Sequence, residues 1–337
     1  MASDADTLCV GICLPDEDAA YCIGCGRPWG SPTPDTQRYQ VIERGWLSSN
    51  SILLFDGNAA TLVDTGYVGD VEQTLKLVKS TLAGRLLRRI VNTHSHCDHI
   101  GGNAALQREY ACRIDIPAGI EAHIRDWDET ALLLAPAAQR AERFRHDGVL
   151  HPGAWLRMGG MDWQALAAPG HDMDALIFYC PEARVLISGD ALWEDGFGII
   201  FGELFGQPGA LDAQRQTLEM IAGLAIDTVI PGHGKPFSDV RGALERARQR
   251  LAAFTADPAR MARNGLKAGF IFNLLDMQGM PSADLENYLV HVPFFRDIGA
   301  QHLGLDVPEL ADWLLAELKK TGAVVERDGR LLPTMAA

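Results

Sequence analysis

The chain has 337 residues and a net charge of −14, with 47% apolar and 22% charged residues. These values predict a globular protein of about two domains with a large core. The acidic balance argues against a general nucleic-acid binder. We find no apolar run of the roughly 18 residues that a membrane span requires. The start of the chain has acids and no basic-then-apolar pattern, so we expect no secretory signal and a cytoplasmic location.

Four cysteines lie close together near the N-terminus, in a C-x3-C and a C-x2-C pattern: Cys9, Cys13, Cys22 and Cys25. Thiolates at this spacing favour a zinc ion or an iron–sulfur cluster. The segment resembles a short cysteine-rich family of predicted iron–sulfur proteins. Residues 1–30 are therefore expected to form a metal-binding segment whose folding the metal stabilises, because so short a segment buries no core. The alternatives are a redox-active tail or free thiols.

The next part of the chain alternates between strand and helix patterns. Residues 51–64 predict a β-hairpin around an Asp-Gly-Asn turn. Residues 71–82 have helical periodicity, and residues 89–91 form a short apolar run that predicts a buried strand leading to Thr93. This alternation indicates a layered α/β fold.

A cluster of possible metal ligands directly follows that strand: His94, His96, Asp98 and His99. Imidazole nitrogens and carboxylate oxygens suit Zn²⁺ and other first-row ions. This spacing cannot place all four groups on one face of a strand or a helix, so it predicts a strand end that turns into a helix. Gly101 and Gly102 follow, and we expect them to let the backbone turn tightly beneath the metals.

Three further candidate ligands stand at glycine-containing turns after strand-like stretches: His171, Asp190 and His233. Such turns are where a sheet presents side chains to a cleft. We therefore expect all seven residues to meet at one site.

Together, the His-x-His-x-Asp-His cluster and the later His, Asp and His resemble the metallo-β-lactamase superfamily over residues 39–238. The resemblance implies an αββα sandwich, in a catalytic domain at residues 36–240. The residues that it assigns to one metal are His94, His96 and His171. Those that it assigns to the second metal are Asp98, His99 and His233. It places Asp190 between the two metals, and Asp64 matches an aspartate that the family holds next to the ligands.

Two metals in such a site would share a bridging hydroxide. Metal binding lowers the pKa of water from 15.7 to roughly 7, so that this nucleophile exists at neutral pH. We expect Asp190 to bridge the metals and Asp98 to orient the hydroxide or pass on its proton. The expected cofactors are two zinc ions, with iron or manganese as alternatives.

Our first hypothesis for the reaction is hydrolysis of a thioester, ester or lactone of a small molecule, as in glyoxalase II-like members of the superfamily. Lactonase relatives have a tyrosine where Trp193 stands, which weakens the lactone reading. The alternatives are a phosphodiesterase or nuclease, an iron-dependent sulfur dioxygenase, and a non-catalytic sensor. The short interval between Asp190 and His233 lacks the long insert of the RNA-processing members, and the charge is unfavourable for nucleic acid.

Substrate contacts are expected in residues 193–202, an aromatic and glycine-rich segment that directly follows Asp190. Within it we expect Trp193 and Phe197 to contact the substrate, with core packing as the alternative. Lys235, or the pair Arg246 and Arg250, would bind an anionic part of the substrate. Residues 120–150 are expected to be helical and polar and to cap the cleft.

Residues 241–337 are expected to form a helical C-terminal domain. A helix follows Asp306, which serves as its N-cap, and Gly322 fits the position after its end. Residues 323–332 predict a hairpin with an Asp-Gly turn. Helices followed by a small hairpin resemble a winged-helix module, which some hydrolases of the superfamily carry. Because this helix is acidic, the expected partner is a small-molecule substrate and not nucleic acid.

Overall fold

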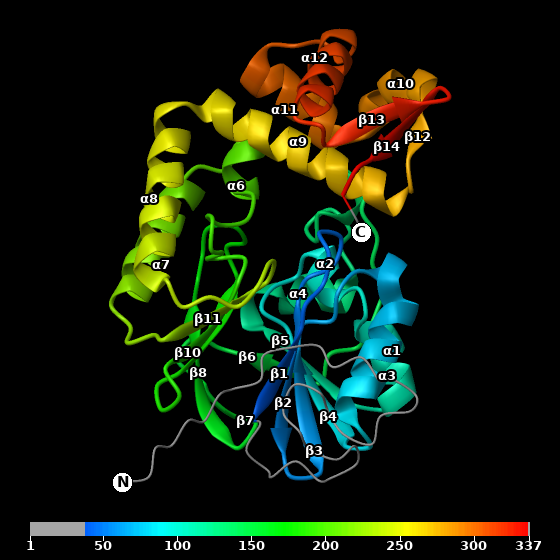
Figure 1. The fold of residues 1–337 in the computed structure, drawn as a ribbon. Coiled ribbons are helices and arrows are strands. Elements are labelled where there is room, and N and C mark those ends of the chain that lie inside the picture. The colour runs from blue at the N-terminus through cyan, green and yellow to red at the C-terminus, as the bar shows by residue number, and fades with distance from the viewer. Residues whose placement is uncertain (1–37, 336–337) are drawn as a thin grey trace, which may run out of the picture. The chain divides into compact units, whose positions relative to one another are not determined.

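Two β-sheets face each other at the centre of the fold (Figure 1). The computed structural model describes residues 38–335. The first sheet contains, in spatial order, β1 (Tyr39–Ile42), β2 (Ser51–Asp56), β3 (Ala59–Val63), β4 (Leu86–Val91), β5 (Arg113–Pro117) and β6 (Gly148–Leu150). The second contains β11 (Thr228–Pro231), β10 (Val185–Gly189), β9 (Leu176–Cys180), β8 (Met161–Ala167) and β7 (Trp155–Met158).

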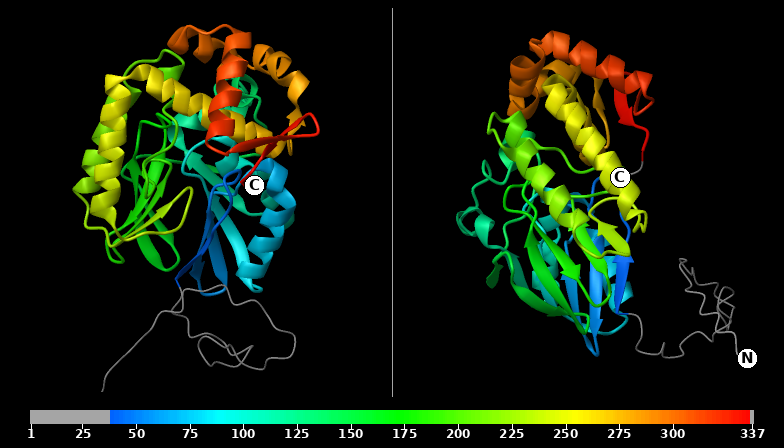
Figure 2. Two further views of the ribbon diagram at one scale, coloured as in Figure 1. Left: turned by 45° about the horizontal axis from the view of Figure 1, so that its top comes forward. Right: turned by 90° about the vertical axis from the view of Figure 1, so that its left-hand side faces the viewer.

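Helices cover the outer faces of both sheets (Figures 1 and 2). The first sheet carries α1 (Val71–Leu82) and α3 (Asn103–Tyr110), and the second carries α7 (Ala210–Ala222) and α8 (Val240–Ala256). This arrangement confirms the expected αββα layers. The expected hairpin is β2 with β3, and the expected helix at residues 71–82 has the bounds of α1.

Side chains along β2 show why two apolar layers form. Ile52 and Leu54 are buried between the sheets, where they share a core with Trp163 of the second sheet. Leu53 points the other way and shares a core with Val78 of α1. Because successive side chains of a strand face opposite sides, a continuous apolar run fills both layers.

The expectation that residues 120–150 are helical is wrong for most of that segment. Only α4 (Glu121–Asp126) and α5 (Leu134–Ala137) are helical before the chain enters β6. Trp127, Leu133 and Ala138 adopt left-handed φ angles of 56°, 58° and 52°. Each of them stands at a helix end, and a left-handed residue stops an α-helix. The remainder of the segment is loop.

The C-terminal part is helical, as expected, and begins with α8. It continues with α9 (Pro258–Asp276), α10 (Leu285–His291), α11 (Pro293–Ile298) and α12 (Val307–Lys320). Asp306 and Glu309 form the reciprocal cap that the sequence predicts for α12. The predicted hairpin is β13 (Val324–Arg327) with β14 (Arg330–Pro333), and β12 (Met280–Pro281) adds a third strand beside β14.

Helix α9 crosses above both sheets at the end where the loops after β4 and β10 lie (Figure 1). Its position brings the C-terminal part next to the candidate ligands. Among residues 38–335, no helix combines the length and the apolar character that a membrane span requires.

Candidate metal centre

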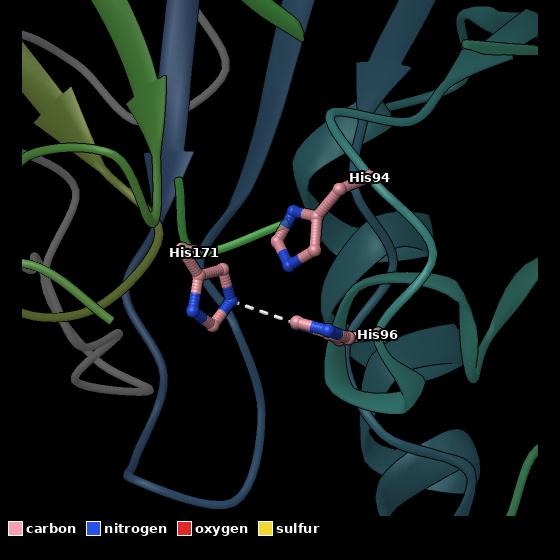
Figure 3. Close-up of side chains that lie close together, drawn as sticks. All are labelled: His94, His96 and His171. Carbon is pink, nitrogen blue, oxygen red and sulfur yellow. Dashed lines mark hydrogen bonds between the residues drawn. The ribbon is translucent and has the colours of Figure 1, made fainter. Parts of the chain in front are cut away.

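Seven side chains converge in two groups near the ends of the strands. The donor atoms of the first group lie within 4.8 Å of one another (Figure 3): His94, His96 and His171. Those of the second group are equally close: Asp98, His99, Asp190 and His233. The structure therefore brings together all seven residues that the sequence singled out.

The local chain explains how distant residues meet. His94 lies in the loop after β4, and His96 is the N-cap of α2 (Cys97–Ile100), which carries Asp98 and His99. This is the expected passage from a strand end into a helix. Asp190 and His233 follow β10 and β11, which are parallel neighbours, so both reach the same edge of the second sheet. His171 enters from the loop between β8 and β9.

Two glycines allow the loops to approach the donors closely. A Cβ atom on Gly232 would lie 2.2 Å from Oδ1 of Asp190, and one on Gly198 would lie 2.4 Å from Nδ1 of His171. Any side chain at these positions would displace a donor. The backbone thus forms part of the wall around the site.

Gly101 is required for close packing and not for an unusual turn. Gly101 and Gly102 have φ angles of −60° and −87°, which other residues also adopt. A Cβ atom on Gly101 would lie 2.3 Å from the backbone nitrogen of Val68, and one on Gly102 would lie 2.4 Å from the carbonyl oxygen of Thr65. The expected role of conformational freedom is therefore wrong, and backbone contact replaces it.

Hydrogen bonds on the far side of the rings orient the imidazoles. Nδ1 of His171 donates to the carbonyl of Ile199 at 2.6 Å, and Nδ1 of His99 donates to Asp64 at 2.8 Å. Their Nε2 atoms are left facing the site. The buried Nε2 atoms of His94 and His99 have no hydrogen-bond partner within the part of the chain that the structure describes. Such unpartnered nitrogens are suited to a cation.

Two nitrogens of the first group face the same point. Nδ1 of His96 and Nε2 of His171 are 2.7 Å apart (Figure 3). Burial lowers the pKa of both imidazoles to about 4 and that of His94 well below its usual value. All three rings are therefore neutral at pH 7, which is the form that binds a metal.

The Asp190 carboxylate belongs to the second group and also approaches the first. Its Oδ2 is 3.4 Å from Nε2 of His171, and its Oδ1 is 3.4 Å from Nε2 of His99. The indole nitrogen of Trp193 donates to the same Oδ1 at 3.1 Å. Burial raises the pKa of Asp190, but His99 and His233 lower it well below the usual value, so the carboxylate is ionised.

The second group concentrates negative charge around His99. Burial lowers the pKa of this imidazole, but Asp190, Asp98 and Asp64 together raise it well above its usual value. A proton on His99 thus balances part of the negative charge of these carboxylates. A metal cation bound among them would have the same effect.

Asp64 supports the histidine loop without facing the cavity. It accepts hydrogen bonds from the backbone nitrogen of Thr93 at 2.9 Å, from the Thr93 hydroxyl at 2.8 Å and from His99. Asp64 is 1% exposed and has a φ of 57°. The structure therefore places it directly behind the donors.

A cavity of about 220 Å³ opens next to the two groups. Five of the seven donors line it: His96, Asp98, His171, Asp190 and His233. Six aromatic side chains from several elements form part of its other walls: Trp46, Trp193, Phe197, Phe201, Phe272 and Phe294. Trp46 packs against both Trp193 and His233, with ring centroids 5.8 Å and 5.4 Å apart.

Helix α9 forms a wall that sequence reasoning missed. It contributes Asn264, Gly269, Phe272 and Asn273 to the cavity lining. One signal was present in the sequence: Gly265 and Gly269 are four residues apart on one helix face, which marks close packing. A Cβ atom on Gly269 would lie 2.7 Å from the ring of Phe294. Trp46 belongs to no motif, and nothing in the sequence indicated its role.

The expected substrate residues differ in where they lie. Trp193 and Phe197 line the cavity. Phe197 is also fully buried, so it both lines the cavity and packs in the core. Lys235 is exposed and does not line the cavity, whereas Arg250 does.

Cys97, Cys112 and Cys180 are buried free thiols. The cysteines expected to bind an N-terminal metal lie outside the described residues: Cys9, Cys13, Cys22 and Cys25.

Comparison with known sequences identifies relatives along most of the chain. A protein named hydroxyacylglutathione hydrolase from Brucella anthropi is 27% identical over 277 residues, covering 80% of this chain and 90% of that protein. A hydroxyacylglutathione hydrolase from Rhodopseudomonas palustris (strain BisB5) is 32% identical over 118 residues, which span only 39% of its length. A beta-lactamase-like protein 2 homolog from Caenorhabditis elegans is 30% identical over 188 residues, covering 55% of this chain and 56% of that protein.

Solved structures share the fold. A metallo-beta-lactamase family protein from Thermus thermophilus superposes with a TM-score of 0.52 at 21% identity, covering 88% of this chain and 98% of that one. A metallo-beta-lactamase from Legionella gormanii gives a TM-score of 0.53 at 14% identity, covering 66% of this chain and 94% of that one. A family model described as the metallo-beta-lactamase superfamily matches residues 44–233, more than half of the chain. The chain therefore belongs to the metallo-beta-lactamase superfamily.

Proposed function

We propose that the protein is a hydrolase that uses two divalent metal ions, preferably zinc, to cleave a thioester, ester or lactone bond of a small molecule. The observation that carries this proposal is the place of Asp190, a member of the second group whose Oδ2 also lies 3.4 Å from Nε2 of His171 in the first group. A single ion would leave the donor atoms of one of these buried groups without a cation to coordinate.

The donors fit such a pair. In this assignment His94, His96 and His171 hold the first ion. The second ion would be held by Asp98, His99 and His233, with Asp190 shared. Imidazoles with carboxylates suit zinc, and a catalytic zinc site keeps a coordination position open for water or substrate. When bound, the ions would polarise the scissile carbonyl and lower the pKa of water to roughly 7, so that a nucleophile exists at neutral pH.

The chain's own residues position the reactants. Trp193 holds one oxygen of Asp190 in place through its indole N–H. Asp98 lines the cavity, and its Oδ2 is 3.0 Å from Nε2 of His233. Burial raises the pKa of Asp98, but His99 and His233 lower it below the usual value, so this carboxylate is ionised and accepts a proton from attacking water. The aromatic walls limit the access of other water.

A thioester is the first choice of substrate for two reasons. A relative that aligns over 80% of the chain is named hydroxyacylglutathione hydrolase. Trp193 also stands where lactonases of the superfamily have a tyrosine, which ranks lactones lower.

The test is a substrate panel on protein loaded with zinc, iron or manganese. The panel holds acyl thioesters, lactones and bis-aryl phosphodiesters. We expect metal-dependent release of thiol from thioesters, and we expect His96→Ala and Asp190→Ala to lose both metal and turnover. Asp162→Asn, at an exposed ion pair with Arg157, is the matched control and should keep both. Turnover by metal-free protein, preference for phosphodiesters, or oxygen consumption with one iron would contradict the proposal.

A further inference from the structure

Arg250 places a positive charge in the wall of the same cavity as the metal donors. Within residues 38–335, its guanidinium has no ion pair and no hydrogen bond to a carboxylate. We propose that Arg250 binds a carboxylate of the substrate, so that the substrate is an acyl thioester or ester that carries one free carboxylate. This inference rests on the proposed function, because it names the substrate class of that site.

The surroundings of Arg250 are apolar. Its guanidinium carbon lies 5.2 Å from the ring centroid of Phe197 and 5.3 Å from that of Phe254. Burial lowers the pKa of this guanidinium, and no acidic side chain opposes the effect. Stacking on aromatic rings compensates part of the lost hydration, but it supplies no acceptor for the N–H donors of the guanidinium. An anion in the cavity would therefore find free N–H donors at this point.

Arg246, on the same helix, has hydrogen-bond and ion-pair partners. One turn earlier on α8, its Nε donates to the carbonyl of Glu194 at 2.8 Å. It also pairs with Asp195 and with Asp239, each at 3.4 Å. Arg246 does not line the cavity. Of the two arginines that the sequence suggests for binding an anion, only Arg250 therefore lines the cavity.

A short loop contacts both the Arg250 guanidinium and the metal donors. Phe197 lies against Arg250, and the next residue, Gly198, packs against the His171 imidazole. The backbone nitrogen of Gly198 also donates to the carbonyl of Asp190 at 2.9 Å. Because one loop touches both ends, an anion at Arg250 and a scissile bond at the donors fit within a single small molecule.

The charge of the lining favours one carboxylate over a phosphate. Among the described residues that line the cavity, Arg250 is the only lysine or arginine. A dianionic phosphate would leave a second charge beside Phe197 and other apolar side chains, which is costly without a partner. A carboxylate carries one charge, and its two oxygens match the fork of a guanidinium.

The experiment compares two thioesters of N-acetylcysteamine. One carries a succinyl group with a free carboxylate, and the other carries the nearly isosteric but neutral succinamyl group. The readout is the ratio of their kcat/KM values on zinc-loaded protein. We expect the wild type to prefer the carboxylate about 10- to 100-fold, as a charge-assisted hydrogen-bond pair implies. Arg250→Met should bring the ratio near one, Arg250→Lys should give an intermediate ratio, and the matched control Arg246→Met should keep the wild-type ratio.

A second readout does not require turnover. The thioether analogue of the succinyl substrate, in which CH₂ replaces the thioester carbonyl, is titrated calorimetrically against wild type and Arg250→Met. Tighter binding to the wild type supports the inference even when no thioester is hydrolysed, an outcome that would defeat only the proposed function. A wild-type ratio near one overturns the inference and leaves the hydrolase intact. Equal loss of both substrates in Arg250→Met also overturns it, because it marks a structural role.

Discussion

Asp64 accepts three hydrogen bonds that fix the loop carrying His94 and the ring of His99. Asp64→Asn replaces one acceptor oxygen with a donor and tolerates the left-handed backbone of this position. Loss of support behind a metal ligand weakens metal binding roughly 10- to 100-fold. We therefore expect zinc affinity to fall by that factor while the fold remains, as measured by competition with a chelator. Unchanged affinity would show that Asp64 does not position the donors.

His96 predicts a pH dependence of the metal-free protein. Burial lowers its pKa to about 4 from 6.5, so between these values the unfolded chain binds more protons than the folded one. Stability from this group is complete above pH 6.5 and is lost as the pH falls toward 4. In chelator-treated protein, His96→Gln should lose less stability than the wild type over this window. Urea unfolding from pH 4 to 7 measures it, and parallel curves for the two proteins would contradict it.

The ligand residues could be predicted from the sequence because each stands in a motif or after a recognisable strand. His94 to His99 are dense enough to be found alone, and Asp190 lies at the end of an apolar run. Trp46 and Asn273 could not be predicted in this way. They line the cavity through tertiary packing, and no local pattern distinguishes them from core residues.

At the scale of the element, α9 joins packing to the shape of the cavity. Gly269→Ala would bring a Cβ atom to 2.7 Å from the Phe294 ring, which itself lines the cavity. Overpacking of this kind costs about 1–3 kcal/mol. We expect a loss of that size in the free energy of unfolding, measured with urea, together with a changed KM. Gly223→Ala, where the nearest atom would be 3.4 Å away, is the control. Equal behaviour of the two variants would refute the packing account.

Elements with local signals were the ones predicted well. The Asp306 and Glu309 cap fixes the start of α12, and Asp328 with Gly329 fixes the turn between β13 and β14, because the required chemistry lies within a few residues. The expected helix is wrong at residues 127–138 because Trp127, Leu133 and Ala138 adopt left-handed φ angles. No glycine marks these turns, so the sequence conceals them.

At the scale of the whole molecule, the order of strands and helices predicted a layered α/β fold, and the resemblance to the superfamily predicted the αββα sandwich. Neither predicted that α9 and α11 would close the cavity above the donors, since that contact depends on Gly269 and Phe294 meeting across separate helices. The predicted boundary near residue 240 therefore divides two parts that share one cavity: α8 and α9 line it together with the loops after β10 and β11.

The central claim is that Asp190 is shared by two metal ions. The most direct measurement is the number of zinc ions per chain in dialysed protein, by elemental analysis. The cysteines that could bind additional zinc are first replaced by serine: Cys9, Cys13, Cys22 and Cys25. We expect two ions per chain and the loss of at least one in Asp190→Ala. A single ion at saturating zinc, or two ions retained in Asp190→Ala, would contradict it.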